Sequence, residues 1–214
     1  MKRVTKKESG SARKFAKTVL KFLHKELKEK YIFDEKLVGS ARWNTILKDE
    51  KGFWDIDYQL LLTQNSKEYL NNGLTKATEI KNDFFNCLNE AFKNAPNFRV
   101  ENSTTAITLI NFREKYSLDF VIIKLFPTND LIIRRNNKSF SSKNEYTWNQ
   151  LPKFNRAYEK FNNLPPLEKQ DLIENYVLPR KLLEKKKHES DPSKRTSCEA
   201  FIEEVNNYVR KRNY

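Results

Sequence analysis

Two aspartates separated by a single residue, Asp55 and Asp57, are the side chains in this sequence whose spacing best suits shared chemistry. They lie in an apolar run that ends at Leu62, and its alternation predicts a β-strand that projects both carboxylates from one face. Their Cα atoms are then about 6–7 Å apart, from a strand rise of about 3.3 Å per residue. Because neighbouring carboxylates repel each other, we expect a divalent cation between them. Oxygen ligands of this kind suit Mg²⁺, which also binds substrate phosphates.

A Gly-Ser pair, Gly39 and Ser40, lies upstream of these aspartates. Gly39 permits unusual dihedral angles and a close approach of the backbone. Ser40 is predicted to cap a helix that starts near Ala41, and free N–H groups at a helix N-terminus suit a phosphate. The stretch therefore predicts a triphosphate site beside a metal-binding strand. Without such a function, the same residues would form a turn, a helix and a strand with two surface aspartates.

A third carboxylate, Asp119, lies inside the apolar run Tyr116–Phe126, which is predicted to be a strand. A charge in such a strand is costly unless it is paired or bound to a metal ion. Two interpretations follow from the residues alone. Asp119 is either a further metal ligand or the partner of an Arg or Lys across the sheet.

These features form one pattern: a hydrophobic residue before Gly-Ser, then Asp-x-Asp, then a carboxylate on a later strand. The pattern resembles the nucleotidyltransferase superfamily of DNA polymerase beta. Thr45 lies where the branch of cyclic GMP-AMP synthase and oligoadenylate synthase often has a Thr. The resemblance is closest to the bacterial members of that branch. It implies two Mg²⁺ or Mn²⁺ ions held by three catalytic carboxylates, Asp55, Asp57 and Asp119. It also implies that the Gly-Ser pair binds the triphosphate of a nucleotide.

The C-terminal part extends the resemblance. Bacterial members of the branch have a Trp-x-x-x-Pro segment after the catalytic strands, and Trp148 and Pro152 are similar to it. The resemblance then implies that a Lys of a basic helix, Lys181 or Lys185, and Ser197 at the start of the next helix contact the triphosphate. Judged from the residues alone, these lysines equally suit a solvated helix face, and Ser197 equally suits a helix cap.

The hydrophobic pattern predicts an α+β chain in which strands are followed by a helical C-terminal part. The resemblance implies a nucleotidyltransferase fold, with a small mixed β-sheet flanked by helices and a C-terminal helical bundle. Helices are expected over 11–31 and 66–94, and strands over 98–100, 104–112, 116–126 and 131–135. Residues 136–147 are expected to form a loop, and helices follow from Trp148, from the Pro pair at 165–166 and from Thr196. We therefore expect a catalytic core over residues 1–135 and a helical domain over 136–214 that completes the nucleotide site.

The composition bounds the partners and the location. Lys and Arg total 41 against 28 acidic residues, a formal charge of +13. This charge favours polyanions such as nucleoside triphosphates or nucleic acid, although a biased genome would also produce a Lys-rich and Asn-rich chain. No apolar run approaches the roughly 20 residues of a membrane span. The two cysteines give no disulfide framework, so we expect a cytoplasmic protein without a membrane partner.

The expected function is metal-dependent transfer of NMP from an NTP to a hydroxyl group. The resemblance implies that the acceptor is another nucleotide, which would make a cyclic or linear oligonucleotide second messenger of antiviral defence. The alternatives are transfer to an RNA 3′ end, a small molecule or a protein, with nucleic acid as activator or acceptor. A non-catalytic nucleic-acid-binding module is a further alternative.

Overall fold

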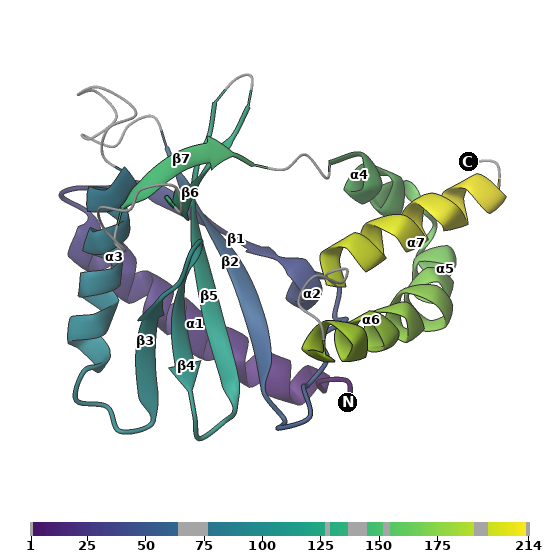
Figure 1. Cartoon of the computed structure of the whole chain (residues 1–214), viewed down its shortest axis with the longest axis horizontal. Coiled ribbons are helices and arrows are strands. Elements are labelled where there is room, and N and C mark those ends of the chain that lie inside the picture. Colours follow the sequence, from purple (N-terminus) through teal and green to yellow (C-terminus); the bar gives the residue numbers. More distant parts are fainter. Residues whose placement is uncertain are drawn as a thin grey trace. The chain divides into compact units, whose positions relative to one another are not determined.

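The computed structural model describes residues 2–63, 77–126, 129–136, 145–151, 155–190 and 197–212. The chain divides into two compact units, one spanning Lys2–Leu151 and the other Pro152–Tyr214. The first unit holds a seven-stranded sheet with helices, and the described part of the second is helical (Figure 1). The chain is therefore α+β, as the hydrophobic pattern predicts.

The sheet has the strand order β1-β2-β5-β4-β3, with β6 paired to β5 and β7 paired to β6. Only the β2–β5 pair is parallel among the described strands, and every other pair is antiparallel. The parallel pair places strands that are more than fifty residues apart in sequence side by side at the centre of the sheet. The strands are β1 (Phe33–Val38), β2 (Trp54–Leu62), β3 (Phe98–Asn102), β4 (Ala106–Asn111), β5 (Tyr116–Lys124), β6 (Leu131–Arg135) and β7 (Tyr146–Gln150).

Two long helices, α1 (Lys6–Leu27) and α3 (Ala77–Phe92), bury one face of this sheet; α1 runs behind the strands in Figure 1. The strands facing them alternate strictly, so that in β2 every second residue from Trp54 to Leu62 is buried and the others are partly exposed. Aromatic contacts join the layers, as in the edge-to-face pair of Phe33 and Phe84 at 5.2 Å between ring centroids. On the opposite face, the first halves of β2 and β5 carry polar residues, among them Asp55, Asp57 and Asp119.

The first helix begins earlier than its apolar stripe predicts. It starts at Lys6 because Thr5 and Glu8 form a capping box, in which the Glu8 N–H donates to Thr5 Oγ1 at 3.2 Å and the Thr5 N–H donates to Glu8 Oε2 at 2.9 Å. The expected range of 11–31 misses this cap, and it also extends past the observed end at Leu27. The expected helix over 66–94 is found as α3, and its residues 66–76 lie outside the described part.

The prediction that a loop over 136–147 leads into a helix from Trp148 was wrong for residues 146–150. These form β7, which pairs antiparallel with β6. Tyr146, Thr147 and Trp148 are good strand formers, and the edge of β6 gives them a pairing partner that no local pattern reveals. The first compact unit ends at Leu151. Residues 137–144 of the expected loop lie outside the described residues.

The described part of the C-terminal unit is built from α4 (Asn155–Asn163), α5 (Pro166–Leu172), α6 (Leu178–Ser190) and α7 (Ser197–Lys211). Pro166 occupies the first turn of α5, where a missing N–H costs nothing. A π-helical turn, Ile173–Val177, links α5 to α6 just before Pro179, where the sequence predicts a kink or restart. The start of α7 agrees with a cap at Thr196, although Thr196 itself lies outside the described residues.

No helix in the described part of the chain is long and apolar enough to cross a bilayer.

Candidate active site

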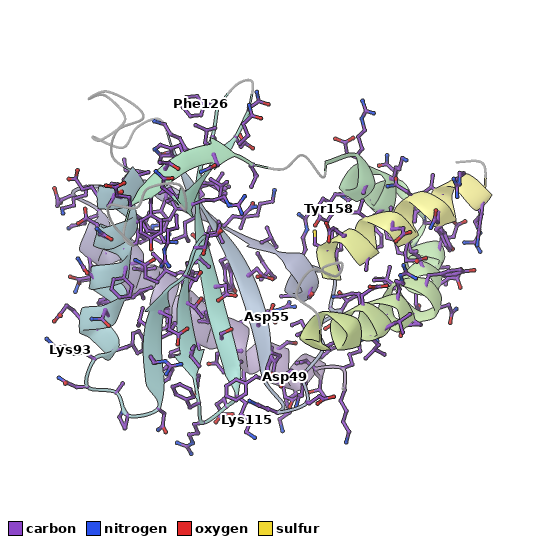
Figure 2. The ribbon with its side chains drawn as sticks, viewed as in Figure 1. Asp49, Asp55, Lys93, Lys115, Phe126 and Tyr158 are labelled. Atoms are coloured by element: carbon purple, nitrogen blue, oxygen red, sulfur yellow. The ribbon has the colours of Figure 1, made fainter. Side chains whose placement is uncertain are left out.

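The parallel pairing of β2 with β5 brings the predicted carboxylates together. Asp57 lies directly opposite Asp119, and Asp55 lies opposite Ser117. Neighbouring strands are about 4.8 Å apart, and residues opposite each other point to the same side of a sheet. All three carboxylates therefore lie on the face that α1 and α3 leave uncovered. Figure 2 labels Asp55 on β2.

The surroundings of Asp119 make it an unusual carboxylate. Its pKa is raised from 3.8 to about 6, and burial is the largest cause. A hydrogen bond with the Thr108 side chain lowers the pKa, and the negative charges of Asp55 and Glu101 raise it. Its Oδ1 atom is buried and has no hydrogen-bond partner among the described residues. No Arg or Lys forms an ion pair with it in the described part of the chain. Of the two interpretations of Asp119, the one based on a cross-strand cation is therefore not what the structure shows.

A divalent cation fits the donor set on this face. The orphaned Asp119 oxygen and its neighbours, the Asp57 and Asp55 carboxylates, are the hard oxygen ligands that Mg²⁺ and Mn²⁺ prefer. Among the described residues, however, no three His, Cys, Asp or Glu side chains are already gathered closely enough to hold an ion. The backbone places the donors in adjacent positions, and the side chains of Asp55, Asp57 and Asp119 would have to turn toward a shared ion.

Gly39 is required at its position for two separate reasons. Its φ of +60° lies in the left-handed region, which favours glycine. A Cβ atom at this position would overlap Asp57 Oδ2 and lie 3.1 Å from Asp57 Cγ. The close approach follows from the sheet, because Val38 at the end of β1 pairs with Asp57. The Gly-Ser pair therefore begins in direct contact with the carboxylate face.

Ser40 does not cap a helix as the sequence predicts. The short helix α2 (Gly39–Arg42) starts at Gly39, one residue before Ser40, and no side chain caps it. Gly39 already turns the chain out of β1, so Ser40 lies within the single helical turn. One turn aligns few peptide dipoles, which weakens the expected attraction of a helix N-terminus for phosphate.

Thr45 closes the segment that follows. Its side chain is buried, and both its backbone N–H and its Oγ1 donate to the Ser40 carbonyl, at 2.9 and 3.5 Å. Thr45 thus holds the backbone at the Ser40 carbonyl. This is a physical reason for a Thr at the position that the family resemblance singles out.

The remaining predicted contacts belong to the C-terminal unit. Lys181 lies on α6 with a buried side chain, one residue after Arg180, which pairs with Glu184 at 3.3 Å. Lys185 lies on the same helix, and Ser197 is the first residue of α7. Their contact with a nucleotide stays a prediction. Of the Trp-x-x-x-Pro segment, Trp148 lies on β7 and Pro152 lies outside the described residues.

Two residues of the site were missed by sequence reasoning. Thr108 on β4 pairs with Asp119, and Glu101 on β3 pairs with Thr108, so that one row across the sheet runs from Glu101 through Thr108 and Asp119 to Asp57. A Thr in an alternating strand carries no signal of its own. Only the register of β4 against β5 shows that this hydroxyl meets the third carboxylate.

Comparison with protein-family models and with curated protein sequences finds no match. Solved structures do match. The STING-associated c-di-GMP synthase CdnE of Capnocytophaga granulosa superposes with a TM-score of 0.58 at 16% identity, covering 98% of this chain and 62% of that one. Escherichia coli DncV, in its 3′-deoxy GTP bound form, gives a TM-score of 0.54 at 12% identity over 80% of this chain and 60% of that one.

The chain has the nucleotidyltransferase fold. The likeness confirms the fold that the Gly-Ser and Asp-x-Asp motifs predict. The chain spans less than two thirds of the length of either protein. Within this nucleotidyltransferase fold, the three carboxylates and the Gly-Ser turn lie in the first unit, Lys2–Leu151.

Proposed function

We propose that this chain transfers a nucleotidyl group from a nucleoside triphosphate to a hydroxyl of a second nucleotide. The observation that carries the proposal is the pairing of Asp57 with Asp119 on the open face of a nucleotidyltransferase sheet. The buried, unpartnered Asp119 Oδ1 supports it, because an uncompensated carboxylate is costly unless it serves a ligand.

Asp55, Asp57 and Asp119 would hold two Mg²⁺ or Mn²⁺ ions, which would neutralise the triphosphate oxygens and stabilise the entering and leaving oxygens. In the reaction, the acceptor oxygen bonds to the α-phosphorus as the bond from that phosphorus to the β-phosphate oxygen breaks. Pyrophosphate leaves, and the hydroxyl proton passes to Asp119 or to water.

Gly39 and Ser40 would contact the phosphates. Gly39 packs against the Asp57 carboxylate, so a phosphate chain lying along this turn would also lie beside Asp57. Lys181 and Ser197 would supply further phosphate contacts from the C-terminal unit. Orientation of this kind accounts for a large part of the barrier reduction in phosphoryl-transfer chemistry.

The product that we propose is a cyclic or linear oligonucleotide, acting as a second messenger in antiviral defence. The proteins of similar fold support this, because one is described as a c-di-GMP synthase and another was solved with 3′-deoxy GTP bound. Transfer to an RNA 3′ end, a small molecule or a protein is the alternative, and it would use the same carboxylates with a different acceptor surface.

A nucleic-acid activator or acceptor is supported by the outer side of α1. Five of its lysines are exposed, and each is three, four or seven residues from the next. This spacing places all five on one side of the helix. They span residues 7 to 25, or about 27 Å at 1.5 Å per residue. A stripe of this length suits a polyanion, and binding to it would weaken as salt rises. The lysines are Lys7, Lys14, Lys17, Lys21 and Lys25.

The test is incubation of the full chain with labelled NTPs and Mg²⁺ or Mn²⁺, without and then with RNA, followed by mass spectrometry of the products. We expect pyrophosphate release that disappears in Asp57→Asn and persists in Asp34→Asn, a matched control on the exposed part of β1. A product of two or three nucleotides identifies messenger synthesis, and an extended RNA identifies the alternative acceptor. RNA binding without turnover under either metal, unchanged in Asp119→Asn, would indicate the non-catalytic module.

A further inference from the structure

One partly buried arginine of α1 contacts the Gly-Ser turn, and the proposed chemistry does not use it. Arg13 donates from its terminal NH₂ group to the Ala41 carbonyl, 28 residues along the chain. Ala41 follows Ser40 directly and is completely buried. The contact therefore links the middle of α1 to the backbone of α2.

The guanidinium of Arg13 is partly buried and forms no ion pair among the described residues. Its Nε atom is buried and has no hydrogen-bond partner among them. Removing a charged group from water is costly unless hydrogen bonds compensate for it, so the contact of the terminal NH₂ group with the Ala41 carbonyl holds this side chain in place. That carbonyl belongs to α2, the turn that is proposed to bind the phosphates.

The residues that follow α2 are also held, by hydrogen bonds from residues that precede α1. Both Nε and the terminal NH₂ of Arg3 donate to the Asn44 carbonyl, at 3.2 and 2.9 Å, and Asn44 has a φ of +57°. The Val4 N–H donates to the Ile46 carbonyl at 3.0 Å. The backbone from Ala41 to Ile46 is therefore fixed at three points by residues that precede or lie within α1.

We propose that Arg13 is a positioning residue for the triphosphate: it holds the Gly39–Arg42 turn against α1, so that Ser40 and the backbone around it are already arranged when the nucleotide arrives. The inference rests on the proposed function, and it assigns to α1 a role in nucleotide affinity. Loss of the contact leaves the carboxylates in place on β2 and β5. The defect is therefore expected in binding of the NTP and not in the chemical step.

The experiment compares Arg13→Met and Arg13→Lys in the full chain, with Lys6→Met as a control that removes one exposed charge from the same helix. We expect Arg13→Met to raise the KM for NTP about tenfold or more, with kcat within about threefold of wild type, as for a loss of substrate positioning. Arg13→Lys should restore part of the affinity, because an ammonium group reaches the carbonyl through a single contact. Lys6→Met should leave KM unchanged.

A second readout does not depend on turnover. The Asn44 and Thr45 N–H groups donate to the carbonyls of Ala41 and Ser40, at 3.3 and 2.9 Å, so their hydrogen exchange reports how firmly the turn is held. We expect faster exchange at these two amides in Arg13→Met and wild-type exchange in Lys6→Met. Unchanged exchange, or a KM shift no larger than that of Lys6→Met, would overturn the proposal. If wild type makes no product at all, the proposed function fails, and the exchange comparison still decides whether Arg13 holds the turn.

Discussion

Asp119 shows how a single side chain links stability to function. Its carboxylate is placed in an apolar strand with one oxygen hydrogen-bonded to Thr108 and the other unpartnered. A cation bound here would offset the free-energy cost of burying the Asp119 carboxylate, and it would do so only while the ion is bound. The metal-free chain is therefore expected to carry a local destabilisation at Asp119.

Asp119→Asn should raise the free energy of unfolding by about 1–3 kcal/mol in EDTA, because a neutral amide avoids the desolvation that raises the carboxyl pKa. The same substitution should abolish pyrophosphate release. Urea denaturation in EDTA measures the first effect and a pyrophosphate assay the second. The exposed Asp34→Asn serves as the control. A less stable Asn variant would show that the wild-type carboxylate is already compensated within the fold.

Gly39→Ala tests the contact between the Gly-Ser turn and the carboxylate face. The substitution should cost about 1–2 kcal/mol for the left-handed φ alone, and the added Cβ must also displace the Asp57 carboxylate. We therefore expect lower stability together with a loss of more than about tenfold in activity.

The control for Gly39→Ala is Gly10→Ala. Gly10 lies in α1, where a Cβ would meet nothing within 4 Å, and Ala there should stabilise the helix by about 0.5–1 kcal/mol. Chemical denaturation and initial rates of both variants provide the measurement. Equal effects of the two substitutions would mean that Gly39 has no special role.

At the scale of elements, the outer strand β7 depends on a side chain of α3. The Tyr146 N–H donates to Thr78 Oγ1 at 2.9 Å, and Thr78 Oγ1 donates to the Tyr146 carbonyl at 3.2 Å. One hydroxyl thus satisfies both backbone groups of a strand residue, as a neighbouring strand would. This is how the sheet ends here without a further strand beside Tyr146.

Thr78→Val should therefore cost about 1–3 kcal/mol, because it leaves a buried N–H and carbonyl unpaired while keeping the side-chain shape. Hydrogen exchange of the Tyr146 amide should accelerate, and urea denaturation should report the loss. Thr147→Val, on the exposed side of the same strand, is the control and should change stability by less than about 0.5 kcal/mol. Similar losses in both variants would contradict the role assigned to the Thr78 hydroxyl.

Helices and strands whose signals lie within a few neighbouring residues were predictable, and those that depend on contacts with distant segments were not. The apolar stripe of α1, the alternation of β2 and the proline at the start of α5 are each encoded within a few residues. The prediction of a helix from Trp148 was wrong because strand β7 depends on its pairing with β6 and on its contact with Thr78. The start of the short α2 was misplaced by two residues because Gly39 turns the chain earlier than the Ser40 cap suggests.

For the molecule as a whole, a buried lysine sets a pH dependence of global stability. Lys81 on α3 is completely buried; its ammonium donates to the Thr105 carbonyl and lies 5.2 Å from the centre of the Tyr146 ring. Burial, with a smaller effect of the Arg135 charge, lowers its pKa from 10.5 to about 7. The unfolded chain therefore binds one more proton than the folded chain between pH 7 and pH 10.5.

The free energy of unfolding should therefore rise with pH across this window, by up to about 1.4 kcal/mol per pH unit from Lys81. Below pH 7, Lys81 should contribute no pH dependence. Lys81→Met removes the titrating group and should flatten the rise, with its largest stabilising effect at neutral pH. Urea denaturation of both proteins from pH 6.5 to 9.5 provides the measurement. Parallel pH profiles for the two proteins would show that Lys81 is charged in the folded state throughout.

The alternation of β2 and the apolar surroundings of Asp119 are local properties, so the sequence alone was enough to predict two carboxylates on one strand, a third on another and a Gly-Ser pair before them. Whether these groups share a face depends on the register of β2 against β5. That register is set by the packing of both strands on α1 and α3, which no window of sequence contains. Tertiary structure likewise decided that Thr108 meets Asp119 and that Arg13 reaches Ala41, because contacts between distant segments are fixed by the fold and not by spacing along the chain.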